Sequence, residues 1–76
     1  MTERAEIAMV FEQGGDHTRA RASLTLGGAT FTGNGRARRN PEDTELSEVG
    51  AELAAARALS DLAHRLVEAA AGLLSR

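Results

Sequence analysis

The sequence predicts an α+β domain in which a three-stranded antiparallel meander is followed by one long C-terminal helix. Between about residues 4 and 38, apolar and polar side chains alternate with a period of two, which is typical of strands that bury one face. From about residue 47 to residue 74 the chain is rich in Ala and Leu, contains no Pro and follows the helical period. We therefore expect a single domain over residues 1–76, with strands at about 4–12, 18–26 and 29–38 and a helix at about 47–74.

The second and third strands are expected to form a tight hairpin. Gly27–Gly28 separates two alternating runs, and both glycines accept the positive φ that a two-residue turn requires. Such a turn fixes the register, so that Leu26 faces Ala29 and Leu24 faces Phe31. This register pairs apolar with apolar residues and polar with polar residues, which supports it.

The polar face of this hairpin is predicted to be basic. In the register above, Arg19 lies directly opposite Arg36, and this arrangement is unfavourable unless a negative group lies nearby. The negative group could be Glu12 of the first strand, a phosphate, or a partner chain. We expect nucleic-acid phosphates to bind the following residues: Arg19, Arg21, Arg36, Arg38 and Arg39. The alternative is a solvated sheet face balanced by Glu6 and Glu12.

This basic surface is not expected to read bases. The chain has no Trp or Tyr, and Phe11 and Phe31 fall on the apolar side of their strands, so no aromatic ring is available for base stacking. Gly33 and Gly35 lie inside a strand and do not open a helix, which is unlike a phosphate-binding loop. We expect these two glycines to allow a close approach between the helix and the sheet, or to form a bulge.

The helix is predicted to need two neighbours. Its apolar arc covers roughly 220°, whereas a surface helix needs only about 100°. One apolar seam contains Leu59, Leu62, Leu66 and Leu73, and a second contains Val49, Leu53, Ala56, Val67 and Leu74. A chain of this size has only one sheet to offer, so we expect an intertwined or helix-swapped homodimer. The dimer interface is predicted to use Leu53, Leu59, Leu62, Leu66, Val67 and Leu73.

Composition excludes several classes of function. There is no Cys, and His17 and His64 lack neighbours at metal-ligand spacing, so we expect surface histidines, no metal, no cofactor, no catalytic residues and no small-molecule substrate. No apolar run of about 18 residues is present, and the charged N-terminus does not resemble a signal peptide. We therefore expect a cytoplasmic protein that is not an enzyme and has no membrane partner.

Three stretches resemble a known family: Thr18–Leu24, Gly33–Asp43 and Glu48–Ala63. They are similar to small actinobacterial proteins of unknown function whose fold is like that of double-stranded-RNA-binding domains. The segments Ala37–Pro41 and Ala56–Leu62 carry the most specific part of the likeness, which covers about residues 5–67. The resemblance implies a βββα protomer, an intertwined dimer and a likeness to ribosome hibernation-promoting factors.

The function expected from the residues and the resemblance together is non-enzymatic binding of the ribosome or structured RNA, in a stress or hibernation role, through the Arg-bearing sheet face. The start of the helix is acidic, which moves any phosphate contact from the helix to the strands; its acids are Glu42, Asp43, Glu45, Glu48 and Glu52. The alternative is a protein–protein interaction module that docks through the helix and binds no nucleic acid.

Overall fold

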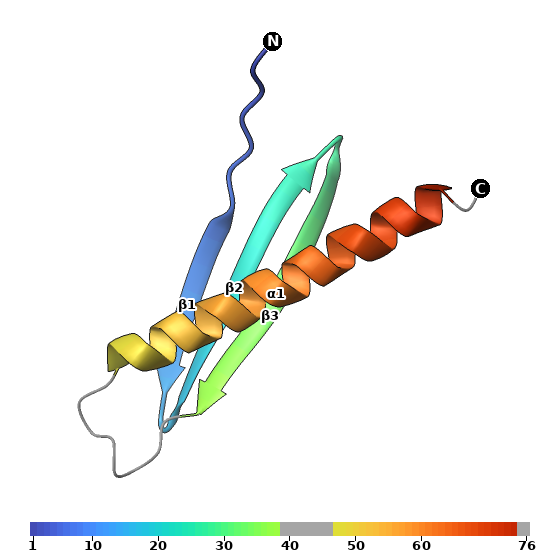
Figure 1. Cartoon of the computed structure of the whole chain (residues 1–76). Coiled ribbons are helices and arrows are strands. Elements are labelled where there is room, and N and C mark those ends of the chain that lie inside the picture. The colour runs from blue at the N-terminus through green and yellow to red at the C-terminus, as the bar shows by residue number, and fades with distance from the viewer. Residues whose placement is uncertain (39–46, 75–76) are drawn as a thin grey trace.

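The computed structural model confirms the predicted βββα order and describes residues 1–38 and 47–74. It contains β1 (Ala8–Gly14), β2 (His17–Leu26), β3 (Ala29–Arg38) and α1 (Ser47–Leu74). The strands form one antiparallel sheet in the order β1-β2-β3, and α1 crosses one face of it diagonally (Figure 1). The molecule therefore has two layers, and the other face of the sheet is left open.

The hairpin register is the one that the sequence predicts. Leu26 pairs with Ala29, Leu24 pairs with Phe31, and further along the strands Arg19 pairs with Arg36. Gly27 and Gly28 both have positive φ, at 58° and 81°, as a two-residue turn between twisted strands requires.

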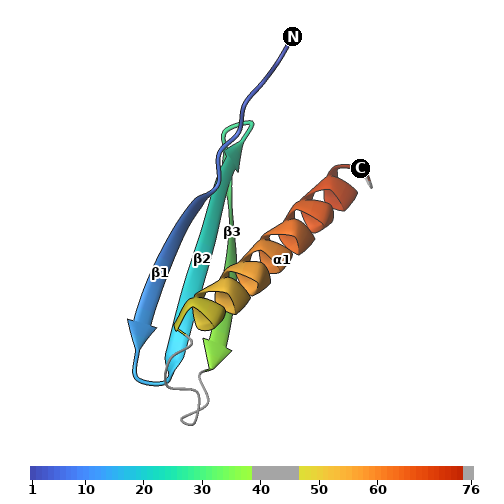
Figure 2. The same cartoon turned by 60° about the vertical axis from the view of Figure 1, so that its left-hand side comes forward.

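The first strand is shorter than expected at its N-terminal end. It begins at Ala8, which pairs with Ser23, whereas the alternation predicts a start near residue 4. Residues 1–7 lead away from the sheet (Figure 2). The helix packs on β2 and β3 and does not cover this corner, so no buried face favours pairing of the segment that contains Glu3, Arg4 and Glu6.

The core consists mostly of small side chains, which brings the helix close to the sheet. Its buried residues are Ala20, Ala22, Leu24, Ala37, Ala54, Ala58 and Leu62, with Met9, Phe31 and Leu66 packed against them. A Cβ atom added at Gly33 would lie 2.3 Å from the carbonyl oxygen of Ala58, and one added at Gly35 would lie 2.1 Å from that of Ala54. The two glycines therefore allow the close helix–sheet approach expected of them.

Side chains of the helix also cover the outer edge of β3. The backbone N–H of Asn34 donates to Oδ2 of Asp61 at 2.8 Å, and Nη1 of Arg57 donates to the backbone oxygen of Arg36 at 2.7 Å. Asp61 also accepts from Nε of Arg65, four residues further along the helix, at 3.3 Å. Arg57 and Asp61 belong to the polar stripe of the helix, which also contains His64, Arg65 and Glu68. This stripe thus satisfies groups that an edge strand otherwise leaves open.

Much of the apolar surface of the helix remains uncovered. Its C-terminal half projects beyond the sheet (Figure 1), and Val67 and Leu73 are 65% and 66% exposed. Leu53 and Leu59 are also exposed, whereas Leu66 is half-buried. Leu62, which is also predicted to lie in the dimer interface, is 2% exposed in the protomer's own core, where it packs between helix and sheet.

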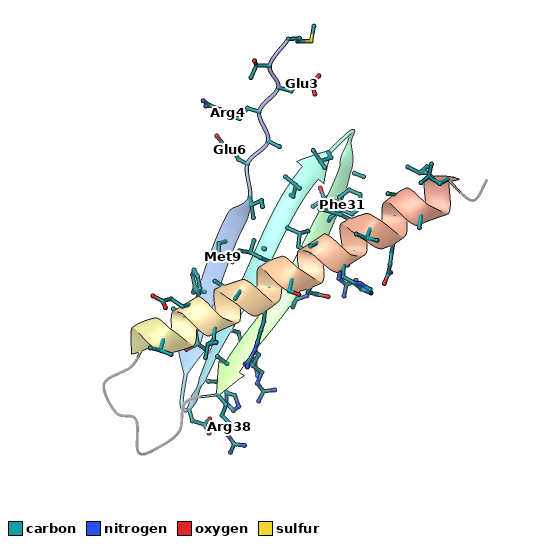
Figure 3. The ribbon with its side chains drawn as sticks, in the orientation of Figure 1. Glu3, Arg4, Glu6, Met9, Phe31 and Arg38 are labelled. Atoms are coloured by element: carbon teal, nitrogen blue, oxygen red, sulfur yellow. The ribbon has the colours of Figure 1, made fainter. Side chains whose placement is uncertain are left out.

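The sheet has an uncovered apolar region of its own. Met9 and Phe31 lie on the face that carries the helix, beside the helix and not beneath its centre (Figure 3). Phe11 is paired with buried Ala20 but is itself 44% exposed, because the helix does not reach over β1.

Within the described residues, no helix is long and apolar enough to cross a membrane.

Candidate nucleic-acid interface

Four arginines share the sheet face that points away from α1, and we call them the basic face: Arg19, Arg21, Arg36 and Arg38. Their neighbours along the chain are buried under the helix, among them Ala20, Ala22 and Ala37. Because successive side chains of a strand point to opposite faces, this burial directs the arginines outward. All four are exposed, as the sequence predicts.

The opposition of Arg19 and Arg36 is real, and little charge compensates it. Glu12 of β1 pairs with Arg19 from the other side, as expected for the candidate counter-charge. Across the described part of the chain, however, no ion pair joins Glu12 to an arginine, and neither Arg19 nor Arg21 has an acidic partner. Arg19 and Arg36 thus face each other without an ion pair to an acid that would balance their charges.

Arg19 lies at the centre of the face. It lines a shallow depression with Ala20, Asn34, Gly35 and Arg36, and a second one with Glu12, Gln13, Gly14 and His17. The floor of the first depression is formed by the strands themselves, since Ala20 is directed to the other face. An anion in it can therefore approach the guanidinium groups of Arg19 and Arg36 together.

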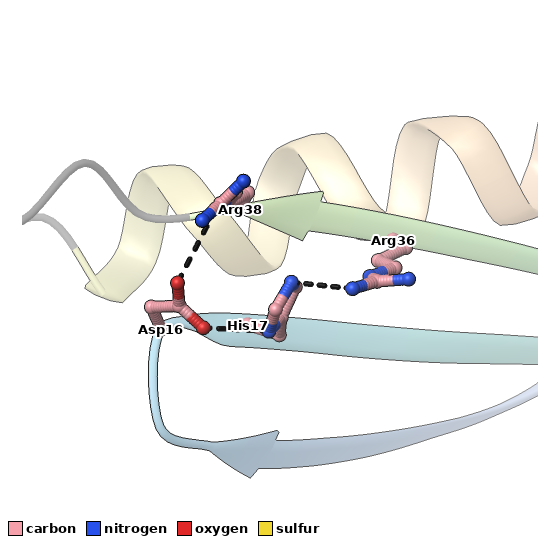
Figure 4. A network of polar contacts seen from close by, with 4 residues as sticks. All are labelled: Asp16, His17, Arg36 and Arg38. Atoms are coloured by element: carbon pink, nitrogen blue, oxygen red, sulfur yellow. Dashed lines mark hydrogen bonds and ion pairs between the residues drawn. The ribbon is translucent and has the colours of Figure 1, made fainter.

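Arg36 and Arg38 of this face belong to a network of polar contacts at the β1–β2 turn (Figure 4). Nδ1 of His17 lies 2.7 Å from Oδ1 of Asp16, and Nε of Arg38 donates to Oδ2 of the same carboxylate at 3.3 Å. The guanidinium of Arg36 makes a short hydrogen bond to Nε2 of His17. Asp16 and His17 thus hold Arg38 and Arg36 respectively.

The network defines a tautomer for the histidine. A guanidinium can only donate, so Nε2 of His17 accepts from Arg36 and Nδ1 carries the proton that is donated to Asp16. Burial acts to raise the pKa of Asp16, but His17, a backbone hydrogen bond and Arg38 outweigh it, and the pKa lies below its ordinary value. The carboxylate is therefore ionised at neutral pH.

This network does not follow from the residue pattern used to predict the site. The sequence predicts a surface histidine at His17, yet the side chain is only 26% exposed and touches two charged groups. The available signal was the register: extending the hairpin pairing to its end places His17 opposite Arg38. His64, by contrast, is an exposed helix residue 2.7 Å from Glu68.

Other predicted features fall outside this face. Arg39 and the acids at positions 42, 43 and 45 lie outside the described residues. Glu52 is exposed on the helix, on the opposite side of the sheet from the basic face. In the portion that is described, no group of three His, Cys, Asp or Glu side chains is placed to hold a metal ion.

Comparison with known proteins identifies the family. A sequence model described as Rv2632c-like matches residues 3–76. The chain belongs to the Rv2632c-like family. This membership confirms the resemblance to actinobacterial proteins of unknown function, since the relatives below are mycobacterial.

Uncharacterized protein Rv2632c of Mycobacterium tuberculosis (strain ATCC 25618 / H37Rv) is 44% identical over 61 residues, which cover 80% of this chain and 66% of that protein. Uncharacterized protein Mb1767 of Mycobacterium bovis is 47% identical over 51 residues, which cover 67% of this chain and 54% of the relative. The matches thus span less than two thirds of the length of these relatives.

The crystal structure of Rv2632c supports the fold of the family in this chain. It matches with a TM-score of 0.92 at 36% identity, and the match covers 99% of this chain and 89% of that one. The names of these relatives state no activity, ligand or partner. The likeness to hibernation-promoting factors therefore stays a prediction.

Proposed function

We propose that the protein binds structured RNA through phosphate contacts made by the basic face. The observation that carries the proposal is the pairing of Arg19 with Arg36 across two strands, with no acid bound to Arg19 among the described residues. Bound phosphate would relieve the repulsion between these guanidinium groups, and Arg binds phosphate in a bidentate manner.

The chemistry of the face favours recognition of the RNA backbone. Both phenylalanines lie outside the basic face, and Thr25 and Thr30 bond to each other at 2.9 Å at its far end. The surface thus offers charge and hydroxyl groups, and no ring for stacking. Binding of this kind depends on the shape and charge of the nucleic acid and is independent of base sequence.

We propose the ribosome as the target, because it is the structured RNA that the family resemblance suggests. A role in stress or hibernation is proposed from the same resemblance. The proposal includes a cytoplasmic protein with no cofactor, no small-molecule substrate and no catalytic step.

A salt-dependent binding assay tests this function. A 20-base-pair RNA duplex and purified ribosomes would each be titrated at several salt concentrations with wild type and with Arg19→Glu/Arg36→Glu. We expect the affinity of wild type to fall as the salt concentration rises. In the double variant, the dependence of log K on log salt should be shallower, by about 1 unit of slope for each lost contact. Arg4→Glu, outside the sheet, makes one charge reversal of the same kind, and is compared with the single variant Arg19→Glu as a control for the change in net charge. Binding that ignores salt, or that survives the double substitution, would refute the phosphate contact.

We further propose that the protein is a homodimer. The protomer leaves uncovered an apolar sheet region around Met9 and Phe11 and the second apolar helix seam, around Leu53, Val67 and Leu74. The sheet region lacks a helix and the helix seam lacks a sheet, so a second copy related by a two-fold axis supplies both. A different protein on the same seam is the alternative, as an interaction module that binds no RNA.

A further inference from the structure

The arginines of the basic face differ in how they are held. Arg36 is bonded to His17 and Arg38 to Asp16 (Figure 4). Arg19 and Arg21, in contrast, have no ion pair to a described acid. The end of the face next to the β1–β2 turn is therefore controlled by groups that can change their charge. Of these groups, only His17 belongs to the residue type that titrates between about pH 5 and 8.

The surroundings of His17 are mainly basic. Arg38 of β3 lies opposite His17 in the strand register, and Arg36 donates a hydrogen bond to the ring. Arg19 lies two residues further along the same face of β2. Asp16 is the acid in contact with the ring, and Glu12 of β1 lines the same depression as His17 and Arg19. The helix packs on the other face of the sheet.

We propose that Asp16 and His17 are positioning residues that hold Arg38 and Arg36, and that protonation of His17 frees Arg36 and strengthens phosphate binding at this end of the basic face. This inference rests on the proposed RNA-binding function. It adds a regulator to that function, because affinity would then depend on pH as well as on salt.

The geometry of the ring gives the switch its mechanism. In neutral His17, Nε2 accepts a hydrogen bond from Arg36 while Nδ1–H donates to Asp16. One proton taken up at Nε2 removes that acceptor and places an imidazolium against a guanidinium. Arg36 then turns toward solvent, where a phosphate can bind it, and the face gains one positive charge.

The ionised carboxylate of Asp16 fixes the direction of the switch. The lowered pKa of Asp16 keeps it charged through mildly acidic pH, so the ring keeps its Nδ1–H bond in both states. The proton is therefore gained at the nitrogen that faces Arg36. Asp16 also keeps Arg38 in place while Arg36 moves.

Affinity for a 20-base-pair RNA duplex at constant ionic strength tests the proposal. We expect wild type to bind about three- to tenfold more tightly at pH 5.5 than at pH 8, because one further phosphate contact forms. His17→Gln cannot gain the proton and should lose this difference. His64→Gln removes the other histidine, on the helix, and should keep it. A difference that persists in His17→Gln, or that disappears in His64→Gln, would overturn the proposal.

A second measurement without RNA separates the switch from the binding function. The Nε–Hε signal of Arg36 would be followed by NMR while the imidazole of His17 is titrated. We expect both signals to change over the same pH range in wild type, and the Arg36 signal to be constant in His17→Gln. An Arg36 signal that ignores the titration of His17 contradicts the network. Absence of duplex binding at every pH, with the NMR coupling intact, contradicts the proposed function alone.

Discussion

At the scale of single residues, the two glycines of β3 set the distance between helix and sheet. A Cβ atom at Gly35 would lie 2.1 Å from the backbone oxygen of Ala54 and 2.3 Å from the backbone nitrogen of Ala58. Both contacts are to helix backbone, which cannot rotate aside as a flexible side chain can. The small core therefore depends on residues that have no side chain at all.

We expect Gly35→Ala to destabilise the fold by about 3 kcal/mol, because the helix must move away from the sheet to admit the methyl group. Gly72→Ala is the matched control, since a Cβ there meets nothing within 4 Å and the helix should gain up to about 1 kcal/mol. Urea unfolding at one protein concentration measures both. Equal stability of Gly35→Ala and wild type would show that the close contact is not required.

The two perturbed aspartates predict how stability changes in acid. The Asn34 N–H bonded to Asp61 holds the pKa of this carboxyl below its ordinary value, and the network at the turn does the same for Asp16. Because both pKa values are lowered by folding, their stabilisation is present above the unfolded-state pKa and is lost as pH falls through the folded value. We expect the urea concentration at the unfolding midpoint to decrease as the pH is lowered below about 4. Asp61→Asn should weaken this dependence on pH. A midpoint that is constant from pH 7 to pH 2.5 would contradict the assignment.

At the scale of the elements, the two edges of the sheet differ. The β3 edge is covered by Arg57 and Asp61, which are one turn apart on the helix and bond one acceptor and one donor of the strand. Within the described residues, no hydrogen bond or ion pair from the helix covers β1, and Val10 and Phe11 are exposed there. The helix thus holds β3 by polar bonds as well as by packing.

Removing both edge contacts should loosen the helix from the sheet. We expect Arg57→Ala/Asp61→Ala to cost about 1–3 kcal/mol, since two hydrogen bonds to strand backbone are lost. Arg65→Ala is the control: it removes only the exposed pair with Asp61 and should cost less than about 1 kcal/mol. Hydrogen exchange of the Asn34 amide reports the edge directly, and unchanged protection in the double variant would contradict this role.

At the scale of the whole molecule, the uncovered apolar surface predicts the oligomeric state. We expect light scattering after size-exclusion chromatography to give twice the chain mass. Val67→Glu/Leu73→Glu should yield monomers, because two carboxylates would be buried in the interface. His64→Glu places one carboxylate on the polar stripe of the same helix and should leave the dimer intact. A wild-type mass equal to that of one chain would refute the dimer. A complex with a different protein would support the alternative of an interaction module.

Several features could be predicted because they depend on local rules. The period of two and the Gly27–Gly28 turn were enough to set the register, and with it the opposition of Arg19 and Arg36. The length and composition of the helix gave its bounds and its excess of apolar surface. Membership of the Rv2632c-like family agrees with this reading of the fold.

Other features were decided by the path of the helix across the sheet. Periodicity places Leu62 and Leu59 on the same seam, but only the crossing direction buries the first and exposes the second. The same path leaves β1 uncovered, shortens it, and brings Asp61 to the edge of β3. The sequence by itself thus determined the elements, their register and the basic face, because these follow from spacing along the chain. The tertiary structure alone decided which apolar residues remain exposed and how His17 holds Arg36, because these depend on contacts between residues far apart in sequence.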